Sequence, residues 1–280
     1  MPEADSKVRY RKRTRLVSVS LMGLLDFLRL RQRDRGAPEP ATGGGSLVEV
    51  ELRAKRPGDL TGLGRLELPE GRLITSFDNP DAGPVAWLST GDGDQARLWV
   101  RLVGRFASIG LWPVVVETLA GDASRPWESG EFGGPVGPVA EAGEVLGPRG
   151  AAVPARASHT RLVELRSPAW AAQIMLVPVT RPADVPARIG WDGPVNHGLN
   201  GADVSAMLRS WEDRFGAVLT GIGFNTLTLT VPHPPTEPDE IRQVMHEIYA
   251  FCPDLVDQGV GEIGGLDPMV RGREWIFWWD

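Results

Sequence analysis

The stretch GADVSAMLRSWEDRF, residues 201–215, decides the fold of the C-terminal part of the chain, because it has the pattern of an amphipathic helix. Its apolar side chains recur at intervals of three and four residues, as they do on one face of a helix: Val204, Met207, Leu208, Trp211 and Phe215. Asp203 is a suitable N-cap and Gly216 a suitable end. The charged side chains fall on the other face, where we expect them in solvent: Arg209, Glu212, Asp213 and Arg214.

Residues 217–280 continue with two strands, a helix and a strand. The segment AVLTGIGFNTLTLTV (217–231) contains two strand patterns, and the second alternates leucine or valine with threonine. A helix is predicted to start at the cap Thr236 and to end before Pro253. REWIFWWD (273–280) has the pattern of a last strand. The order α-β-β-α-β predicts an α+β fold, with a mixed or antiparallel sheet covered by helices.

Upstream segments show the same mixture of elements. The strand patterns LVEVEL, GRLITSF and PVAWLST precede a helical pattern at 94–110 and a strand at 111–119. Gly and Pro are frequent between 120 and 158, which indicates a linker or a functional loop. We therefore divide the chain into four parts: 1–46, a basic segment and linker that we expect to be disordered; 47–119, a β-α-β portion; 120–158, a Gly/Pro-rich connection; and 159–280, a C-terminal α+β domain.

Charge is unevenly distributed along the chain. The net charge is −6, but residues 1–35 carry ten Lys or Arg against four acidic residues, so the remainder is strongly acidic. An acidic folded part predicts no nucleic-acid partner. The single cysteine, Cys252, excludes an intramolecular disulfide and favours a reducing compartment, so we expect a cytoplasmic protein.

The segment KVRYRKRTRLVSVSLMGLLDFLRLRQRDR (7–35) begins like a signal peptide, with a basic run followed by an apolar one. Asp26 and Arg29 interrupt the apolar run, and no small-residue cleavage site follows. The segment is also too short and too charged to span a bilayer. Two interpretations stay open. Residues 7–35 are a basic amphipathic segment that binds a membrane surface or an acidic partner, or they have no function and translation starts at Met22.

The segment STGDGDQA (89–96) formally matches a dinucleotide-binding loop. A strand precedes it, a helix follows, and the glycine spacing and an acid after the next strand are present: Gly91, Gly93, Ala96 and Glu117. However, Asp92 and Asp94 would put negative charge where a pyrophosphate must bind, whereas both are favourable at a helix N-terminus. We expect a capped helix start here, and weak nucleotide binding through Gly91–Ala96 is the alternative.

Other catalytic and metal-binding motifs are missing from the sequence. HEIYA (246–250) begins like a zinc-protease helix, but Ala250 stands where the second histidine is required. His246 and Glu247 lie off the apolar stripe of their helix, so we expect both in solvent. The four histidines are scattered without metal-ligand spacing, and neither a G-x-S-x-G elbow nor a P-loop lysine is present. We therefore predict no metal and no cofactor.

The last strand is rich in aromatic side chains. Alternation places Trp275, Phe277 and Trp279 on one side and Ile276 and Trp278 on the other. A strand buried in the core on both faces explains this composition. An aromatic wall in a pocket or an interface is the alternative, because tryptophan is enriched where binding energy is concentrated.

Several separated segments carry a family resemblance. LRSWEDRFGA (208–217), GFNTLTLTV (223–231), AFCPD (250–254) and WIFWWD (275–280), in this order, resemble the bacterial domain-of-unknown-function family 4253, which is common in actinobacteria. GLWPVVV, RPWESGEF and VPARIGWDGPVN look like segments that accompany that domain in longer members. The resemblance implies no established activity. It implies only that Cys252 and Asp254 line a pocket, through the similar CPDLVDQG stretch.

We expect a non-enzymatic interaction or ligand-binding module, of the immunity or accessory type, because no nucleophile-base pair, metal cluster or phosphate loop can be identified. Its partner would be another protein or a small ligand. The alternative is an enzyme that acts on a small molecule in an aromatic-lined pocket. The candidate binding residues are Trp211, Glu212, Arg214, Cys252, Asp254, Trp278 and Trp279. In the enzyme alternative, Glu212, Arg214, Asp254 or His246 supplies acid-base chemistry or anchors the substrate.

Overall fold

The computed structural model describes residues 47–280 except 92, 121, 123, 154–161 and 167–172. The chain divides into two units, Met1–Thr42 and Gly43–Asp280, and the described residues all belong to the second. The basic segment 7–35 and the alternatives for it lie outside the described residues. None of the helices in the described ranges combines the length and the apolar character that crossing a bilayer requires.

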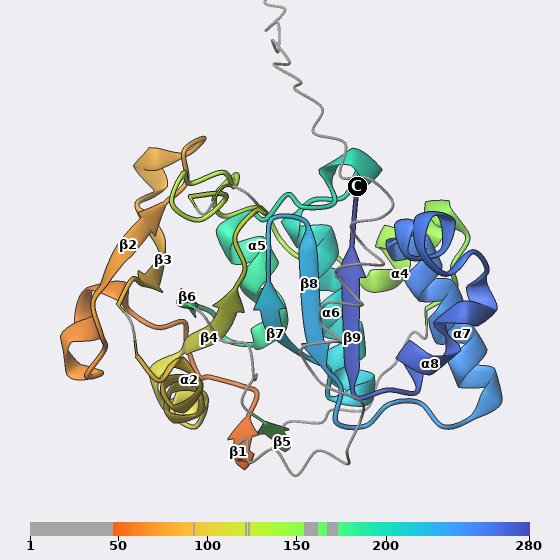
Figure 1. The fold of residues 1–280 in the computed structure, drawn as a ribbon, viewed down its shortest axis with the longest axis horizontal. Helices are drawn as coiled ribbons and strands as arrows, with labels where there is room; N and C mark the ends of the chain where they lie inside the picture. The colour runs from red at the N-terminus through yellow and green to blue at the C-terminus, as the bar shows by residue number, and fades with distance from the viewer. Residues whose placement is uncertain (1–46, 92, 121, 123, 154–161, 167–172) are drawn as a thin grey trace, which may run out of the picture. The chain divides into compact units, whose positions relative to one another are not determined.

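Seven strands of the described part form one mixed sheet, shown in Figure 1. In spatial order they are β2 (Gly71–Thr75), β3 (Pro84–Ser89), β6 (Gln173–Pro178), β4 (Leu111–Val116), β7 (Val218–Ile222), β8 (Thr226–Thr230) and β9 (Glu274–Trp278). The neighbours pair antiparallel except β4 and β7, which are parallel. A separate antiparallel ribbon joins β1 (Leu47–Glu51) to β5 (Leu162–Arg166). The predicted α+β class with a mixed sheet is confirmed.

The helices of the described part are short except for two. They are α2 (Gln95–Val103), α3 (Phe106–Ile109), α4 (Ala142–Leu146), α5 (Val185–Ile189), α6 (Gly201–Phe215), α7 (Pro238–Phe251) and α8 (Asp267–Val270). The 3-10 turns are η1 (Leu60–Arg65), η2 (Pro80–Ala82), η3 (Gly147–Arg149), η4 (Pro182–Asp184), η5 (Val195–His197) and η7 (Ile263–Leu266). A π-helix, η6 (Leu255–Val260), follows α7. In Figure 1, α6 lies behind β7, β8 and β9.

Local sequence rules place most helix ends, with two corrections. Asn200, and not Asp203, is the N-cap of α6: its side chain accepts from the Ala202 and Asp203 amides, at 2.8 and 3.2 Å. Asp203 accepts the Asn200 amide in return, which completes a capping box. Thr236 does not cap α7; Glu237 takes that position without a side-chain hydrogen bond. Gly216 ends α6 in the left-handed conformation, as predicted.

Strand β6 joins the earlier and later parts of the chain. It lies between β3 and β4, with Leu176 opposite Trp87 on one side and Pro113 on the other. The portions 47–119 and 159–280 therefore contribute strands to the same sheet. Part of the Gly/Pro-rich connection also packs against this sheet, because the indole of Trp127 is buried and donates to the Glu117 carbonyl at 2.7 Å.

An aromatic cluster fills the space between β9 and the two long helices. Trp211 of α6 stacks on Phe277 of β9 and meets Phe251 of α7 edge-on, with ring centroids 5.3 and 5.4 Å apart. The cluster continues through Trp279 to Trp191. Only one side of β9 is fully buried, since Ile276 and Trp278 on the other side stay half-buried. The expectation of a strand buried on both faces is therefore wrong for the second face.

Candidate functional site

Contrary to the expectation from the sequence, the charged residues of α6 do not lie in solvent. Glu212 is 0% exposed. It accepts hydrogen bonds from Arg53 and from Arg181 Nε (2.9 Å), and its other oxygen accepts the Ala183 amide at 3.1 Å. Asp213 accepts from the same two arginines, at 2.8 and 2.9 Å. Arg53 and Arg181, which are far from α6 in the sequence, cover this face of the helix. Helical periodicity contains no information about such distant residues.

This network of ion pairs connects separate segments of the chain to α6. Burial raises the pKa of the Glu212 carboxyl, while Arg181 and then Arg53 act to lower it. The two arginines follow β1 and precede η4, so Glu212 ties both segments to α6. A surface pair of Arg209 with Asp213, which their spacing allows, does not form, because Arg209 instead pairs with Asp184 at 2.6 Å. Glu212 is thus enclosed by protein groups rather than facing a ligand.

The other face of α6 contains a second buried charge pair. Arg214 Nη1 contacts both carboxylate oxygens of Glu247 on α7, at 3.0 and 2.8 Å, and the indole of Trp211 donates to the same carboxylate at 2.9 Å. The expectation of a solvent-exposed Glu247 is wrong, because this carboxylate is 0% exposed, whereas His246 beside it is exposed as expected. Trp211 and Arg214 therefore serve the contact between α6 and α7.

Three donors converge on Asp254 at the end of β9. His197 Nε2 lies 2.8 Å from Asp254 Oδ2, and the Asp280 amide donates to the same oxygen at 2.8 Å. Gln258 Nε2 donates to the other oxygen at 3.0 Å. These groups come from η5, from the π-helix η6 and from the residues after β9. We call His197, Asp254, Gln258 and Asp280 the His197 site.

The two ring nitrogens of His197 differ, because Nε2 contacts Asp254 whereas Nδ1 faces no protein partner among the described residues. The Gln258 and Asp280 contacts of Asp254 are donors, so the carboxylate is an acceptor and a ring hydrogen is assigned to Nε2 of His197. Nδ1 has no hydrogen-bond partner among the described residues. The side chain is 23% exposed. Arg149 Nη2 donates to the His197 carbonyl at 3.0 Å and holds the backbone in place.

Cys252, Trp278 and Trp279 surround this site without offering reactive groups. The Cys252 thiol is buried and donates to the Trp278 carbonyl at 2.9 Å. Burial raises the pKa of this thiol, which keeps it protonated. The Trp279 indole is buried and donates to the Phe251 carbonyl at 3.2 Å. Only the half-buried Trp278 presents part of its side chain to solvent.

The Gly91–Glu117 alternative gains no support from the geometry. Asp94 caps α2 by accepting the Arg97 amide at 2.9 Å, so an acidic side chain already occupies the helix N-terminus. Strand β6 separates β3 from β4, unlike the adjacent strands of a dinucleotide fold. Glu117 instead accepts from Thr226 Oγ1 at 3.2 Å, between β4 and β8. Gly91 and Gly93 border Asp92, which lies outside the described residues.

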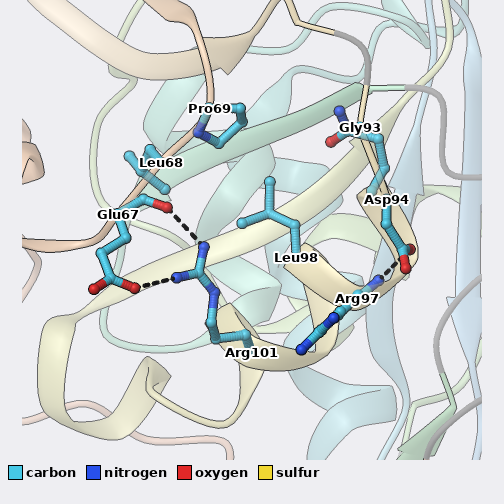
Figure 2. A pocket seen from close by; sticks show the side chains of 9 residues that line it. Glu67, Leu68, Pro69, Gly93, Asp94, Arg97, Leu98 and Arg101 are labelled. Carbon is cyan, nitrogen blue, oxygen red and sulfur yellow. Dashed lines mark hydrogen bonds and ion pairs between the residues drawn. The ribbon is translucent and has the colours of Figure 1, made fainter.

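A hollow of about 540 Å³ lies beside this helix start, and Figure 2 shows it closely. Arg101 donates to the Glu67 carboxylate and carbonyl across the hollow, at 3.2 and 2.8 Å. The bond between Asp94 and Arg97 lies at its other side. The polar groups that line the hollow are thus largely paired with one another.

The seven candidate residues therefore fall into three groups. Cys252, Asp254, Trp278 and Trp279 come together at the end of β9. Trp211 and Arg214 meet Glu247 between α6 and α7, and Glu212 belongs to the arginine network. Sequence reasoning missed His197, because its partner Asp254 is distant in the chain. Within the described ranges, no group of three or more His, Cys, Asp or Glu side chains is placed to hold a metal ion.

Comparison with known proteins identifies a family but no activity. The search of curated proteins found no match, and the search of solved structures found none. The model of one family, described as "Domain of unknown function (DUF4253)", matches residues 173–280. The match begins at the first residue of β6 and includes α6, α7, β9 and the His197 site. Residues 173–280 of this chain therefore belong to the DUF4253 family of domains of unknown function.

Proposed function

We propose that this protein is a ligand-binding module and that its ligand contacts His197 at the end of β9. The observation that carries the proposal is the oriented imidazole. Nε2 is held 2.8 Å from Asp254, while Nδ1 has no partner in the described part of the chain. Because the His197 side chain is 23% exposed, a ligand from solvent can reach this nitrogen, and a ring of fixed orientation with one accessible nitrogen suits recognition of a hydrogen-bonding ligand.

The position of the site in the sheet supports this proposal. β4, β7 and β9 run in the same direction, because β4 pairs parallel with β7 and β8 pairs antiparallel with both β7 and β9. Their carboxyl ends therefore lie along one edge of the sheet. In open parallel α/β sheets ligands bind outside the carboxyl ends of the strands, and the one parallel pair of this α+β sheet, β4 and β7, ends at the same edge as β9. Asp280 follows β9 at this edge and contacts Asp254.

The irregular helix after Asp254 is a second supporting feature. Leu255–Val260 forms a π-helix, a rare conformation that occurs often at functional sites. Gln258, which orients Asp254, comes from this segment. The proposal requires neither a metal nor a cofactor. We further propose a cytoplasmic location, supported by the single cysteine.

Thermal unfolding of the full chain tests the proposal. The probes are the twenty amino acids, the common nucleosides, mono- and dicarboxylic acids and simple sugars, each at millimolar concentration. A ligand at a hundred times its dissociation constant stabilises a protein by about 2.7 kcal/mol, which shifts the unfolding temperature measurably. We expect at least one probe to stabilise the wild-type protein.

The variant H197Q tests whether a stabilising probe binds at the His197 site. The amide nitrogen of glutamine can replace Nε2 as the donor to Asp254, but no group replaces Nδ1. H246Q is the matched control, because His246 is exposed on α7 and its Nδ1 contacts only the Arg242 carbonyl, at 2.7 Å. The stabilisation should be lost in H197Q and kept in H246Q. A shift that H197Q retains, or the absence of any shift, would contradict the proposal.

A further inference from the structure

We infer that His197 is a proton acceptor toward the bound group, so that the ligand presents an O–H or S–H group at Nδ1. This inference rests on the proposed function, since it names the chemistry of the same site. The ligand class is then an alcohol, a phenol, a thiol or a bound water molecule. The geometry favours this class, because an acceptor nitrogen on a ring of fixed orientation selects a donor.

The proton transfer balances without any further reagent. The O–H or S–H bond of the ligand breaks, the proton forms a bond to Nδ1, and the electron pair stays on the ligand oxygen or sulfur. His197 becomes an imidazolium between the ligand anion and Asp254, which remains a carboxylate. Positioned histidines perform this general-base step in enzymes, and a carboxylate on the other nitrogen orients the ring and stabilises the charge.

The hydrogen bonds around Asp254 support an orienting role for this carboxylate. Asp254 is only 5% exposed, and donors from Gln258 and Asp280 fix it in addition to His197. A carboxylate held from several directions cannot rotate away when the imidazole gains a proton. Such outer partners hold the tautomer and the orientation of a functional histidine.

The surroundings of His197 differ from those of a purely structural histidine. A fully buried histidine satisfies both ring nitrogens within the protein, whereas Nδ1 of His197 has no protein partner within the described ranges and the side chain reaches solvent, where a ligand can replace water. Cys252, the nucleophile nearest in sequence to Asp254, is committed to the Trp278 carbonyl and buried. The proton therefore comes from the ligand and not from this thiol.

Diethyl pyrocarbonate measures the reactivity of Nδ1 directly. The reagent acylates unprotonated imidazole nitrogens, and peptide mass spectrometry gives a separate rate for each histidine of the full chain. We expect His197 to react faster than His246 in the same molecules, because Nδ1 of His197 is open to the reagent whereas Nδ1 of His246 contacts the Arg242 carbonyl. This comparison needs no substitution and so does not depend on the folding of a variant.

The variant D254N then tests the role of the carboxylate. It keeps the shape of the side chain, but an amide can donate to the ring as well as accept from it and so no longer fixes the orientation with Nδ1 open; we expect the reaction of His197 to slow while that of His246 is unchanged. Circular dichroism verifies the fold of D254N. If His197 reacts no faster than His246, or if D254N leaves its rate unaltered, the inference is overturned.

The two proposals fail in distinguishable ways, because the acylation rate is measured without a ligand. If the binding of a probe is lost in H197Q but His197 reacts slowly, the proposed binding site is supported and the role of His197 as a proton acceptor is overturned. A fast reaction that depends on Asp254, with no probe bound, supports the reactive imidazole and contradicts the proposed binding function.

Discussion

Arg214 and Glu247 form an ion pair across the contact of α6 with α7, with Nη1 and Oε2 only 2.8 Å apart. Their side chains are 5% and 0% exposed, so both charges are removed from water. Trp211 donates to the same carboxylate and packs on the aromatic side chains of β9. This pair therefore fixes α7 next to the strand that leads into the His197 site.

Replacing Glu247 with alanine should destabilise the protein strongly. The change leaves the Arg214 guanidinium buried without its partner, and breaking a buried ion pair in this way costs about 3–5 kcal/mol. Urea unfolding followed by tryptophan fluorescence measures the loss. D239A on the same helix is the control, because Asp239 is exposed and its loss should leave the midpoint nearly unchanged. The double variant R214M/E247L should recover part of the stability, since neither charge remains buried but the Trp211 indole still lacks its acceptor.

Glu212→Ala should also be costly, because Arg53 and Arg181 lose a shared acceptor. We expect a loss of about 1–3 kcal/mol, because both arginines keep Asp213 as an acceptor while the buried Ala183 amide loses its hydrogen bond to Glu212. Chemical unfolding curves of E212A and D267A give the comparison, since Asp267 forms a half-exposed pair with Arg271. If E212A unfolds at the same denaturant concentration as D267A, the network does not join the segments as described.

Asn200→Ala should lower the stability by about 1 kcal/mol, the usual cost of removing an N-cap side chain. The amides of Ala202 and Asp203 would lose their acceptor at the start of α6. Asn200→Ser keeps an acceptor and should be nearly neutral, which thermal unfolding can resolve. Equal losses for serine and alanine would show that capping is not the cause.

Gly190→Ala should be much more harmful than Gly150→Ala. Both glycines have a positive φ, of 68° and 74°, so both variants pay the conformational strain of about 1 kcal/mol. At Gly190 the added methyl group would also collide with the backbone of Gly134, whereas nothing lies within 4 Å at Gly150. The difference between their unfolding temperatures isolates the collision. Similar temperatures would contradict the close approach of these two segments.

Cys252 should not react with a thiol reagent in the folded protein. Its pKa is raised by burial, so the thiolate is absent at pH 8, where an exposed cysteine with a pKa of about 8.5 is partly ionised. Absorbance after addition of a chromogenic disulfide measures the reaction, and the same sample in denaturant provides the positive control. Rapid labelling of the native protein would show that the thiol is accessible.

Sequence patterns predict the elements of this fold better than their partners. The apolar stripe that includes Trp211 and Phe215 gave α6 correctly, and threonine alternation gave β8, because these patterns depend on neighbours within a few residues. The insertion of β6 between β3 and β4 could not be derived, since a strand pattern contains no information about the strands that pair with it.

The candidate site shows more clearly that local sequence patterns do not indicate which distant residues meet. Glu212 and Glu247 occupy polar positions of their helices, yet Arg53 and Arg214 from other segments make their burial possible. His197 has no local signal at all, because its chemistry arises from Asp254 beyond two strands and two helices. Periodicity indicates which face of a helix is apolar, and only the tertiary structure shows which charges meet there.

The place of β6 in the sheet also constrains the order in which the protein can assemble during synthesis. β6 leaves the ribosome after both of its partners, β3 and β4, so these two strands stay unconnected in the sheet until β6 pairs with both of them, whereas β7 to β9 extend the sheet from the other edge of β4. The family segment 173–280 starts with this strand, so when severed from the preceding residues it would expose both edges of β6 and the edge of β7 that pairs with β4. The nascent chain thus cannot connect β3 to β4 until β6, which ends at Pro178, has emerged.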